Sequence, residues 1–243
     1  MTSDHKRSVL VFGSSGQIGR AIVAQFASED RKVTAVSRGG AKIHASDVVE
    51  VACDPFEVSE EQLSVALAPD RSPFDAVVWA QGVNLNDSLT SLDWPKHLEV
   101  LKANCLYVTF TLSALLKAGL LSRAGARLCV ISSIWQTRAR QEKFSYIVSK
   151  AALQGVVLSA AADLAEHGHL VNAVLPGALK TPMTESVLSP AQIGALASAT
   201  RFGRLANLSD VCDLVSFLCS ERNTSITGQF ISVDLGYQNV RIV

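Results

Sequence analysis

Tyr146 and Lys150 form a pair whose residue types and spacing could do chemistry. They stand four residues apart in a stretch of helical spacing, so on a helix they share one face and lie one turn from each other. A free tyrosine has a pKa near ~10, but a lysine ammonium beside it favours the phenolate and lowers that pKa. Ser133, after an apolar strand-like run, could hold a substrate oxygen against the phenol. Together the three side chains could move a proton to or from an alcohol or carbonyl, although Tyr-x-x-x-Lys also occurs by chance in many helices.

A glycine-rich segment near the N-terminus is a candidate phosphate-binding loop. It follows a short apolar run, precedes a helical pattern and has the spacing G-x-x-x-G-x-G. Glycines let the backbone approach a pyrophosphate, and the helix N-terminus behind them supplies N–H donors and a positive dipole. The segment predicts a dinucleotide site, with a merely flexible strand–helix turn as the alternative. The predicted cofactor contacts in it are Gly13, Ser15, Gln17, Ile18 and Gly19.

The end of the next predicted strand indicates which dinucleotide is bound. Dinucleotide folds place an acidic residue there for the ribose 2′-hydroxyl of NAD, or an arginine nearby for the 2′-phosphate of NADP. This strand ends in Ser37 and Arg38 without a carboxylate, and a guanidinium can pair with a phosphate dianion. We therefore predict NADP, with NADPH preferred over NADH; a solvated surface charge at Arg38 is the alternative.

The elements that must position these residues alternate along the whole chain. Short β-branched apolar runs and longer helical patterns follow one another, which predicts a parallel sheet with helices on both faces. We expect an α/β, Rossmann-type doubly wound sheet of about seven strands in one domain over residues 1–243. The segment 180–204 has weak strand character and a short helical pattern at Ala191–Ala199, and we expect it to be a substrate lid. The predicted strands are Ser8–Phe12, Val33–Ser37, Val48–Ala52, Ala76–Ala80, Arg127–Ile131, Leu170–Leu175 and Phe230–Val233, and the predicted helices are Gln17–Ser28, Glu60–Leu67, Trp94–Leu116, Ser145–His167 and Ser209–Ser220.

Composition argues against several other classes of protein. Charged residues make up 18% of the 243 residues and the formal net charge is +0, so nothing favours nucleic acid or an anionic membrane surface as partner. The five cysteines are scattered and lack metal-ligand spacing, which predicts free thiols in a reducing compartment and no metal. The most apolar window, Ala103–Leu116, is shorter than the ~20 residues of a membrane span. We expect a cytoplasmic protein.

Taken together, these motifs resemble the classical short-chain dehydrogenase/reductase family along nearly the whole chain. Residues 146–150 stand as the family's Y-x-x-S-K, at the usual separation from Ser133. The resemblance implies that Tyr146 is the general acid or base, that Lys150 lowers its pKa and holds the nicotinamide ribose, and that Ser133 orients the substrate oxygen. It also implies that Asn104 completes a proton relay through water. Further cofactor contacts implied in this way are Asp54, Gly82, Tyr146, Lys150, Pro176, Gly177 and Thr181.

Three of these positions have plainer alternatives. Asn104 could satisfy a helix irregularity, Thr181 could cap a helix, and Asp54 before proline could form a turn. The chain also departs from the family pattern: Trp79-Ala80-Gln81-Gly82 stands where Asn-Asn-Ala-Gly is usual, and Phe12 replaces a threonine. These changes put in doubt how that strand end is tied to the adenosine half of the cofactor.

The loop after Ser133 is unusually basic for the family. Trp135, Arg138 and Arg140 are the predicted substrate contacts, and they suggest an anionic substrate; a solvated loop is the alternative. The resemblance implies an NADP-dependent oxidoreductase that interconverts a ketone and a secondary alcohol, possible roles being a 3-oxoacyl or a biosynthetic ketoreductase. It also implies a homodimer or homotetramer. The rival hypotheses are a non-catalytic NADP-binding regulator on the same fold, and dehydration or epimerisation through a transient keto intermediate.

Overall fold

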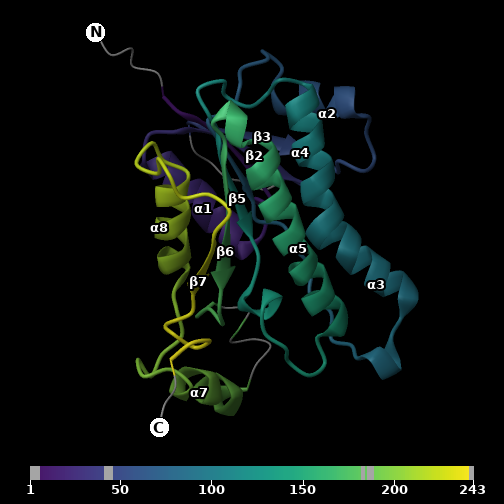
Figure 1. The fold of residues 1–243 in the computed structure, drawn as a ribbon, viewed down its shortest axis with the longest axis vertical. Coiled ribbons are helices and arrows are strands. Elements are labelled where there is room, and N and C mark those ends of the chain that lie inside the picture. The colour runs from purple at the N-terminus through teal and green to yellow at the C-terminus, as the bar shows by residue number, and fades with distance from the viewer. Residues whose placement is uncertain (1–5, 41–45, 182–183, 185–188, 241–243) are drawn as a thin grey trace.

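A seven-stranded, all-parallel sheet forms the centre of the protein (Figure 1). The computed structural model describes residues 6–40, 46–181, 184 and 189–240. The strand order is β3-β2-β1-β4-β5-β6-β7, so β1 lies between β2 and β4, and the chain changes direction across the sheet there. This order confirms the predicted doubly wound sheet. The strands are β1 Ser8–Phe12, β2 Lys32–Ser37, β3 Val48–Ala52, β4 Ala76–Trp79, β5 Arg127–Ile131, β6 Leu170–Pro176 and β7 Phe230–Val233.

Helices cover both faces of the sheet, as predicted (Figure 1). Helices α1 and α8 pack together on one face, and α2, α4 and α5 cover the other, with α3 against α5. Helix α7 lies apart from both layers, beyond the end of the sheet. The helices are α1 Gln17–Ser28, α2 Glu60–Leu67, α3 Trp94–Leu101, α4 Tyr107–Lys117, α5 Phe144–Asp163, α7 Pro190–Ser198 and α8 Leu208–Leu218.

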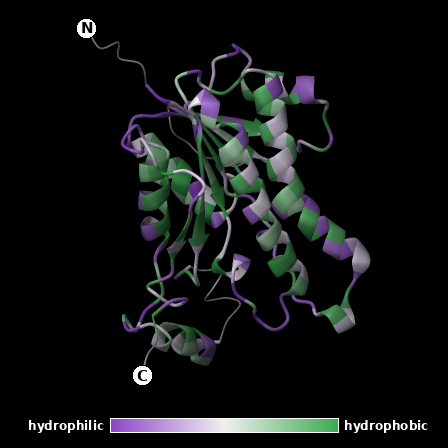
Figure 2. Cartoon of the chain, viewed as in Figure 1, coloured by the Kyte–Doolittle hydropathy of each residue, from purple (hydrophilic) through white to green (hydrophobic). Residues whose placement is uncertain are grey.

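The sheet separates two hydrophobic clusters because successive strand side chains point to opposite faces. On β1, Val9 and Val11 enter the cluster with α1 and α8, whereas Leu10 and Phe12 enter the cluster with α2, α4 and α5. The free cysteines divide in the same way: Cys53 and Cys105 belong to the second cluster and Cys129, Cys212 and Cys219 to the first. Apolar colour accordingly concentrates on the strands and on the helix sides that face them (Figure 2).

Two long helical patterns are interrupted in the structure. The helix expected at Trp94–Leu116 is α3, a π-helical turn at Lys102–Leu106, and α4. The helix expected at Ser145–His167 is α5 followed by a short 3-10 turn, which ends where Gly168 adopts φ 74°. The segment 180–204 contains α7 close to the predicted helix, but part of it lies outside the described residues. The lid role and the single-domain organisation stay predictions.

Two helical stretches, Trp94–Lys117 and Phe144–Asp163, are long and apolar enough to cross a membrane by length and composition alone. Both belong to the layer that covers the sheet, where 50% and 33% of their most apolar windows are buried. Core helices pass the same test, so these stretches are weak evidence for a membrane span.

Candidate active site

Two adjoining cavities lie where the strands end at their carboxyl edge, the usual ligand position in a doubly wound sheet. The first, of about 500 Å³, is lined by Ser133 and Tyr146 and is called the Tyr146 cavity. The second, of about 600 Å³, is lined by Ser37 and Arg38 and is called the Arg38 cavity. Both share four lining residues, so they form one continuous site; these are Gly16, Ala80, Gly82 and Asn84.

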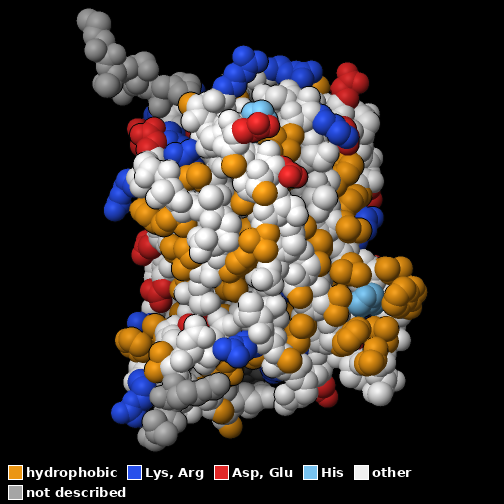
Figure 3. Space-filling model, viewed as in Figure 1, with side chains coloured by type: hydrophobic (Ala, Val, Ile, Leu, Met, Phe, Trp, Pro, Cys, Tyr) orange, Lys and Arg blue, Asp and Glu red, His pale blue; other side chains and the backbone are white. Residues whose placement is uncertain are grey.

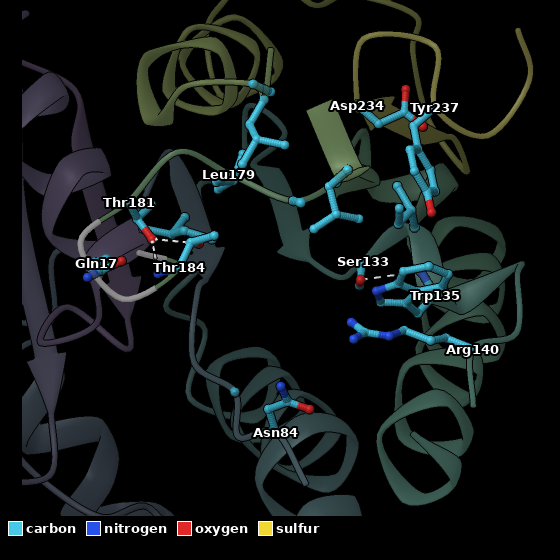
Figure 4. A pocket seen from close by; sticks show the side chains of 18 of the residues that line it. Gln17, Asn84, Ser133, Trp135, Arg140, Leu179, Thr181, Thr184, Asp234 and Tyr237 are labelled. Atoms are coloured by element: carbon cyan, nitrogen blue, oxygen red, sulfur yellow. Dashed lines mark hydrogen bonds between the residues drawn. The ribbon is translucent and has the colours of Figure 1, made fainter. Parts of the chain in front are cut away.

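Ser133, Tyr146 and Lys150 meet at the wall of the Tyr146 cavity. Ser133 follows β5 and caps a 3-10 turn, its Oγ accepting from the Trp135 N–H at 3.3 Å (Figure 4). The Tyr146 side chain on α5 lies beside this serine, which lowers the pKa of the phenol. Lys150, one turn further on, donates its Nζ to the Ile131 carbonyl at 3.0 Å and lies 5.8 Å from the centre of the Tyr146 ring. The three side chains that the sequence singled out are therefore neighbours.

Burial dominates the ionisation of the tyrosine and the lysine. It raises the pKa of Tyr146, and Ser133 offsets only part of that rise. Burial also lowers the pKa of Lys150 to about 8. Lys150 does not bring the net pKa of Tyr146 below its usual value, because the loss of hydration dominates; its effect on the phenolate stays a prediction. A raised pKa keeps the phenol protonated at neutral pH, which suits a proton donor.

Asn104 lies behind the cavity wall, inside the π-helical turn. Its Oδ1 accepts from the Val83 N–H at 2.7 Å, and its Nδ2 donates to the Val83 carbonyl at 3.0 Å and to Ser149 Oγ at 2.8 Å. The side-chain amide therefore ties the π-helical turn to the segment after β4 and to α5. Single π turns occur frequently at functional sites. Its place in a proton relay stays a prediction.

The glycine loop joins the two cavities at the N-terminus of α1. Gly13 has φ 78°, and a Cβ there would lie 2.3 Å from the Gln81 nitrogen, so the loop packs directly on the end of β4. Gly19 is buried in the same packing, whereas the exposed Gly16 faces the cavities at the start of the helix. Ser15 lines the Arg38 cavity, and Gln17 and Ile18 line the Tyr146 cavity. The loop thus leaves backbone accessible at the point where the cavities meet.

The Arg38 cavity has the chemistry expected for an adenosine phosphate. Arg38 is exposed at the end of β2, and the buried Ser37 Oγ has no hydrogen-bond partner among the described residues. The Gln81 Oε1 is likewise buried and unpartnered. Asp54 lines the cavity and also accepts the Phe56 N–H at 3.1 Å, so it forms the turn that was its alternative role. The turn leaves its second oxygen for a ligand.

Trp79 and Phe12, two residues at which the chain departs from the family pattern, form an aromatic pair. Trp79 stacks on Phe12 with ring centres 6.0 Å apart, and its Nε1 donates to Thr111 Oγ1 at 2.8 Å. The Thr111 hydroxyl in turn donates to the Tyr107 carbonyl at 2.7 Å. The end of β4 is therefore anchored to α4 through the tryptophan.

The loop after β6 supplies the opposite wall of the Tyr146 cavity. Gly177 and Thr181 line it, while Pro176 ends the strand without reaching it. The Thr181 Oγ1 accepts the Thr184 N–H at 3.1 Å, which is the capping role left open by the sequence (Figure 4). The capping role and the predicted cofactor contact are both compatible with the position of Thr181.

The basic loop divides into residues that line the cavity and one that does not. Trp135 and Arg140 line the Tyr146 cavity (Figure 4), whereas Arg138 donates to the Gln238 carbonyl at 3.3 Å and to Asn239. Sequence reasoning missed several further lining residues, among them Lys143 of the basic loop. Others include Asn84, Asn86, Phe56, Lys102, Arg204 and Tyr237.

Comparisons with known proteins agree with this fold and site. A family model described as Enoyl-(Acyl carrier protein) reductase matches residues 13–238. The 3-oxoacyl-[acyl-carrier-protein] reductase FabG of Escherichia coli (strain K12) is 28% identical, covering 93% of this chain and 95% of its own. The (3R)-3-hydroxyacyl-CoA dehydrogenase of Rattus norvegicus is 30% identical, covering 93% and 94%. Among solved structures, ElxO with NADP bound has a TM-score of 0.86 at 24% identity, covering 97% of this chain and 100% of that one, which shows a common fold.

The chain therefore belongs to the short-chain dehydrogenase/reductase family. It is an oxidoreductase of CH–OH and C=O groups, as the family resemblance implied.

Proposed function

We propose that the protein is an NADPH-dependent ketoreductase in which Tyr146 supplies the proton. The observation that carries this proposal is that Ser133 and Tyr146 line one cavity, which also reaches the glycine loop. The cofactor preference rests on Arg38 and on the absence of a carboxylate at the end of β2 among the described residues. The relatives named above are, by their names, reductases or dehydrogenases of 3-oxoacyl and 3-hydroxyacyl groups, which supports the direction of the proposal.

The residues of the Arg38 cavity fit a phosphorylated dinucleotide. The unpartnered Ser37 Oγ and Gln81 Oε1 are groups that ribose hydroxyls can satisfy, and Gly16 opens backbone to a pyrophosphate. Arg38 would hold the 2′-phosphate. The nicotinamide, when bound, supplies the hydride that reduces the carbonyl carbon.

The protein's own residues then orient and protonate the carbonyl oxygen. The Ser133 hydroxyl donates to the carbonyl oxygen and orients it toward Tyr146. The phenol gives its proton to that oxygen as negative charge develops there, and the raised pKa ensures that the proton is present. The Lys150 ammonium, fixed by the Ile131 carbonyl, stabilises the phenolate that remains. Asn104 holds Ser149 and the segment after β4 in place beside this set.

Tyr146→Phe tests the proton donor. We expect loss of about 100-fold or more in kcat for NADPH oxidation with a carbonyl substrate, with NADPH affinity nearly unchanged. Turnover at the wild-type rate would disprove the assignment and favour a non-catalytic NADP-binding role.

Arg38→Asp tests the cofactor preference. We expect weaker NADPH binding and comparatively stronger NADH binding, because the carboxylate repels a 2′-phosphate and accepts a 2′-hydroxyl. Fluorescence titration of both cofactors measures the ratio. An equal loss for both would remove Arg38 from the 2′-phosphate.

Assembly as a homodimer or homotetramer and a cytoplasmic location are also part of the proposal. Apolar side chains gather over α3 on the surface in Figure 3, where Trp94 is 60% exposed and Leu98 48%. A partner subunit would cover such a patch. Light scattering of the purified protein tests the oligomeric state.

A further inference from the structure

Lys143 is a buried cation at the edge of the reacting centre. It precedes α5 directly, three residues before Tyr146, and lines the Tyr146 cavity. Only 8% of the residue is exposed. Its ammonium donates to Asn84 Oδ1 at 2.9 Å and to Asn86 Oδ1, two neutral amides. Among the described residues no carboxylate forms an ion pair with it, and a further N–H donor remains for the cavity.

The backbone immediately before Lys143 has an unusual conformation. Glu142 has φ 57°, in the left-handed region that residues other than glycine rarely enter. The nearby carboxylate of Asp87 is already occupied, because it accepts the Ser145 N–H at 3.0 Å and the Ser145 hydroxyl. Burial, and secondarily the charge of Arg140, lower the pKa of Lys143, while the charges of Asp87 and Glu142 act in the opposite direction. The lysine is therefore desolvated, and these two carboxylates attract it without forming an ion pair with it.

Arg140 places a second cation in the same cavity. Its side chain extends from the loop into the cavity beneath Trp135 (Figure 4). In the part of the chain that the structure describes, its guanidinium has no hydrogen-bond or ion-pair partner. A guanidinium binds carboxylates and phosphates through two parallel hydrogen bonds.

The charges that line the Tyr146 cavity do not balance. The described lining residues include the cations Arg140, Lys143 and Arg204 and one carboxylate, that of Asp234; Arg204 is paired with Asp210 at 3.8 Å, outside the lining. Asp234 accepts the N–H groups of Gly236 and Gln238 at 2.9 and 3.1 Å, so its oxygens are engaged. A desolvated cation that forms no ion pair is unfavourable, and an anionic ligand relieves this where a neutral one cannot.

Resting on the ketoreductase function above, we infer that Lys143 and Arg140 form an anion site that selects carbonyl substrates carrying a carboxylate or phosphate over neutral esters and thioesters. Because Lys143 and Tyr146 line the same cavity of about 500 Å³, the charged group and the reacting carbonyl must both fit within it. A small oxo acid or oxo phosphate meets this condition. A carrier-bound acyl chain does not, since its thioester is neutral and its phosphate lies many bonds away.

The test compares charged and neutral partners of the same carbonyl. The full-length enzyme is assayed for NADPH oxidation with acetoacetate against ethyl acetoacetate, and with dihydroxyacetone phosphate against dihydroxyacetone, at low and high salt. These pairs separate a carboxylate from a phosphate preference. The variants are Arg140→Gln, whose guanidinium holds nothing else in place, and Lys143→Gln, which keeps an amide donor for the two asparagines. Arg138→Gln is the matched control from the same loop, outside the cavity.

We expect wild type to prefer the charged member of at least one pair. Lys143→Gln should raise KM for it by about 10- to 100-fold, the range for a hydrogen bond to a charged group, and leave KM for the neutral member unchanged. Arg140→Gln should raise the same KM by less and in a salt-sensitive way, because the group is exposed. Arg138→Gln should change neither.

Three results would overturn the anion site. The first is that wild type reduces the neutral member of each pair as well as or better than the charged member. The second is that KM rises equally for both members in the variants. The third is that no probe is reduced and calorimetry detects no binding of acetoacetate or dihydroxyacetone phosphate to the NADP⁺-loaded enzyme. Failure of the ketoreductase function itself gives a different signature, since Tyr146→Phe would then turn over a reducible carbonyl at the wild-type rate.

Discussion

Replacing Lys150 by methionine should reveal its buried charge as a pH-dependent difference in stability. Burial lowers the pKa of this lysine from 10.5 to about 8, a depression of about 2.5 pH units. Each unit corresponds to ~1.4 kcal/mol, so holding the charge inside the folded protein costs roughly 3 kcal/mol at pH 7. Methionine fills a similar volume without that cost.

The sign of the pH dependence follows from where the proton is held. Below pH 8 the lysine is protonated in both the folded and the unfolded chain, and the full cost is present. Between pH 8 and 10.5 the folded protein has released the proton while the unfolded chain keeps it. The free energy of unfolding of the wild type therefore rises with pH relative to that of Lys150→Met, by about 3 kcal/mol over this window.

Urea unfolding followed by tryptophan fluorescence, at a series of pH values from neutral to alkaline, measures this difference. Cysteines and tyrosines titrate in both proteins, so their effects cancel. The substitution also removes the hydrogen bond to the Ile131 carbonyl, at a cost of about 1–3 kcal/mol that does not follow the same pH curve. Lys150→Gln keeps a donor and should show the same pH slope as the methionine variant. A stability difference that stays constant across this pH range would refute the reasoning.

The remaining predictions concern folding elements around the site, and unfolding curves test each. Gly13→Ala should lower the free energy of unfolding by about 3 kcal/mol or more, because the positive φ and the Gln81 backbone 2.3 Å away leave no room for a Cβ; a fully stable variant would contradict that packing. Gly155→Ala, at an open and exposed position inside α5, should instead raise the free energy of unfolding by about 0.5–1 kcal/mol. A lower free energy of unfolding would mean that the added methyl group meets something outside this single chain. Trp79→Phe keeps the stacking on Phe12 but loses the bond to Thr111, so we expect a loss of about 1–3 kcal/mol; an unchanged midpoint would mean that the tryptophan N–H contributes nothing.

The strands could be predicted from the sequence because buried parallel strands are short, β-branched apolar runs with clear ends. β1, β3, β5 and β7 have the predicted bounds, and β2, β4 and β6 each differ by one residue at one end. The π-helical turn at Lys102–Leu106 could not be predicted in the same way. Its side chains continue the helical apolar pattern, and only the backbone hydrogen bonds distinguish it.

In the candidate site, too, some features follow from the sequence pattern and others depend on the surrounding structure. The meeting of Ser133, Tyr146 and Lys150 follows from spacing and strand order, which a sequence displays. The direction of the Tyr146 pKa depends on burial, which it does not display. Within the basic loop, the sequence could not separate Arg138, which bonds the C-terminal segment, from Lys143, which lines the Tyr146 cavity.

The division of the buried cysteines between the two sides of the sheet gives the protein its own set of thiol reporters. A thiol reagent reaches a buried cysteine only when the surrounding structure opens. Cys53 and Cys105 report on the side covered by α2, α4 and α5, and Cys129, Cys212 and Cys219 on the side covered by α1 and α8. Alkylation rates read by mass spectrometry would therefore show whether the two layers open together or one before the other, without any introduced label.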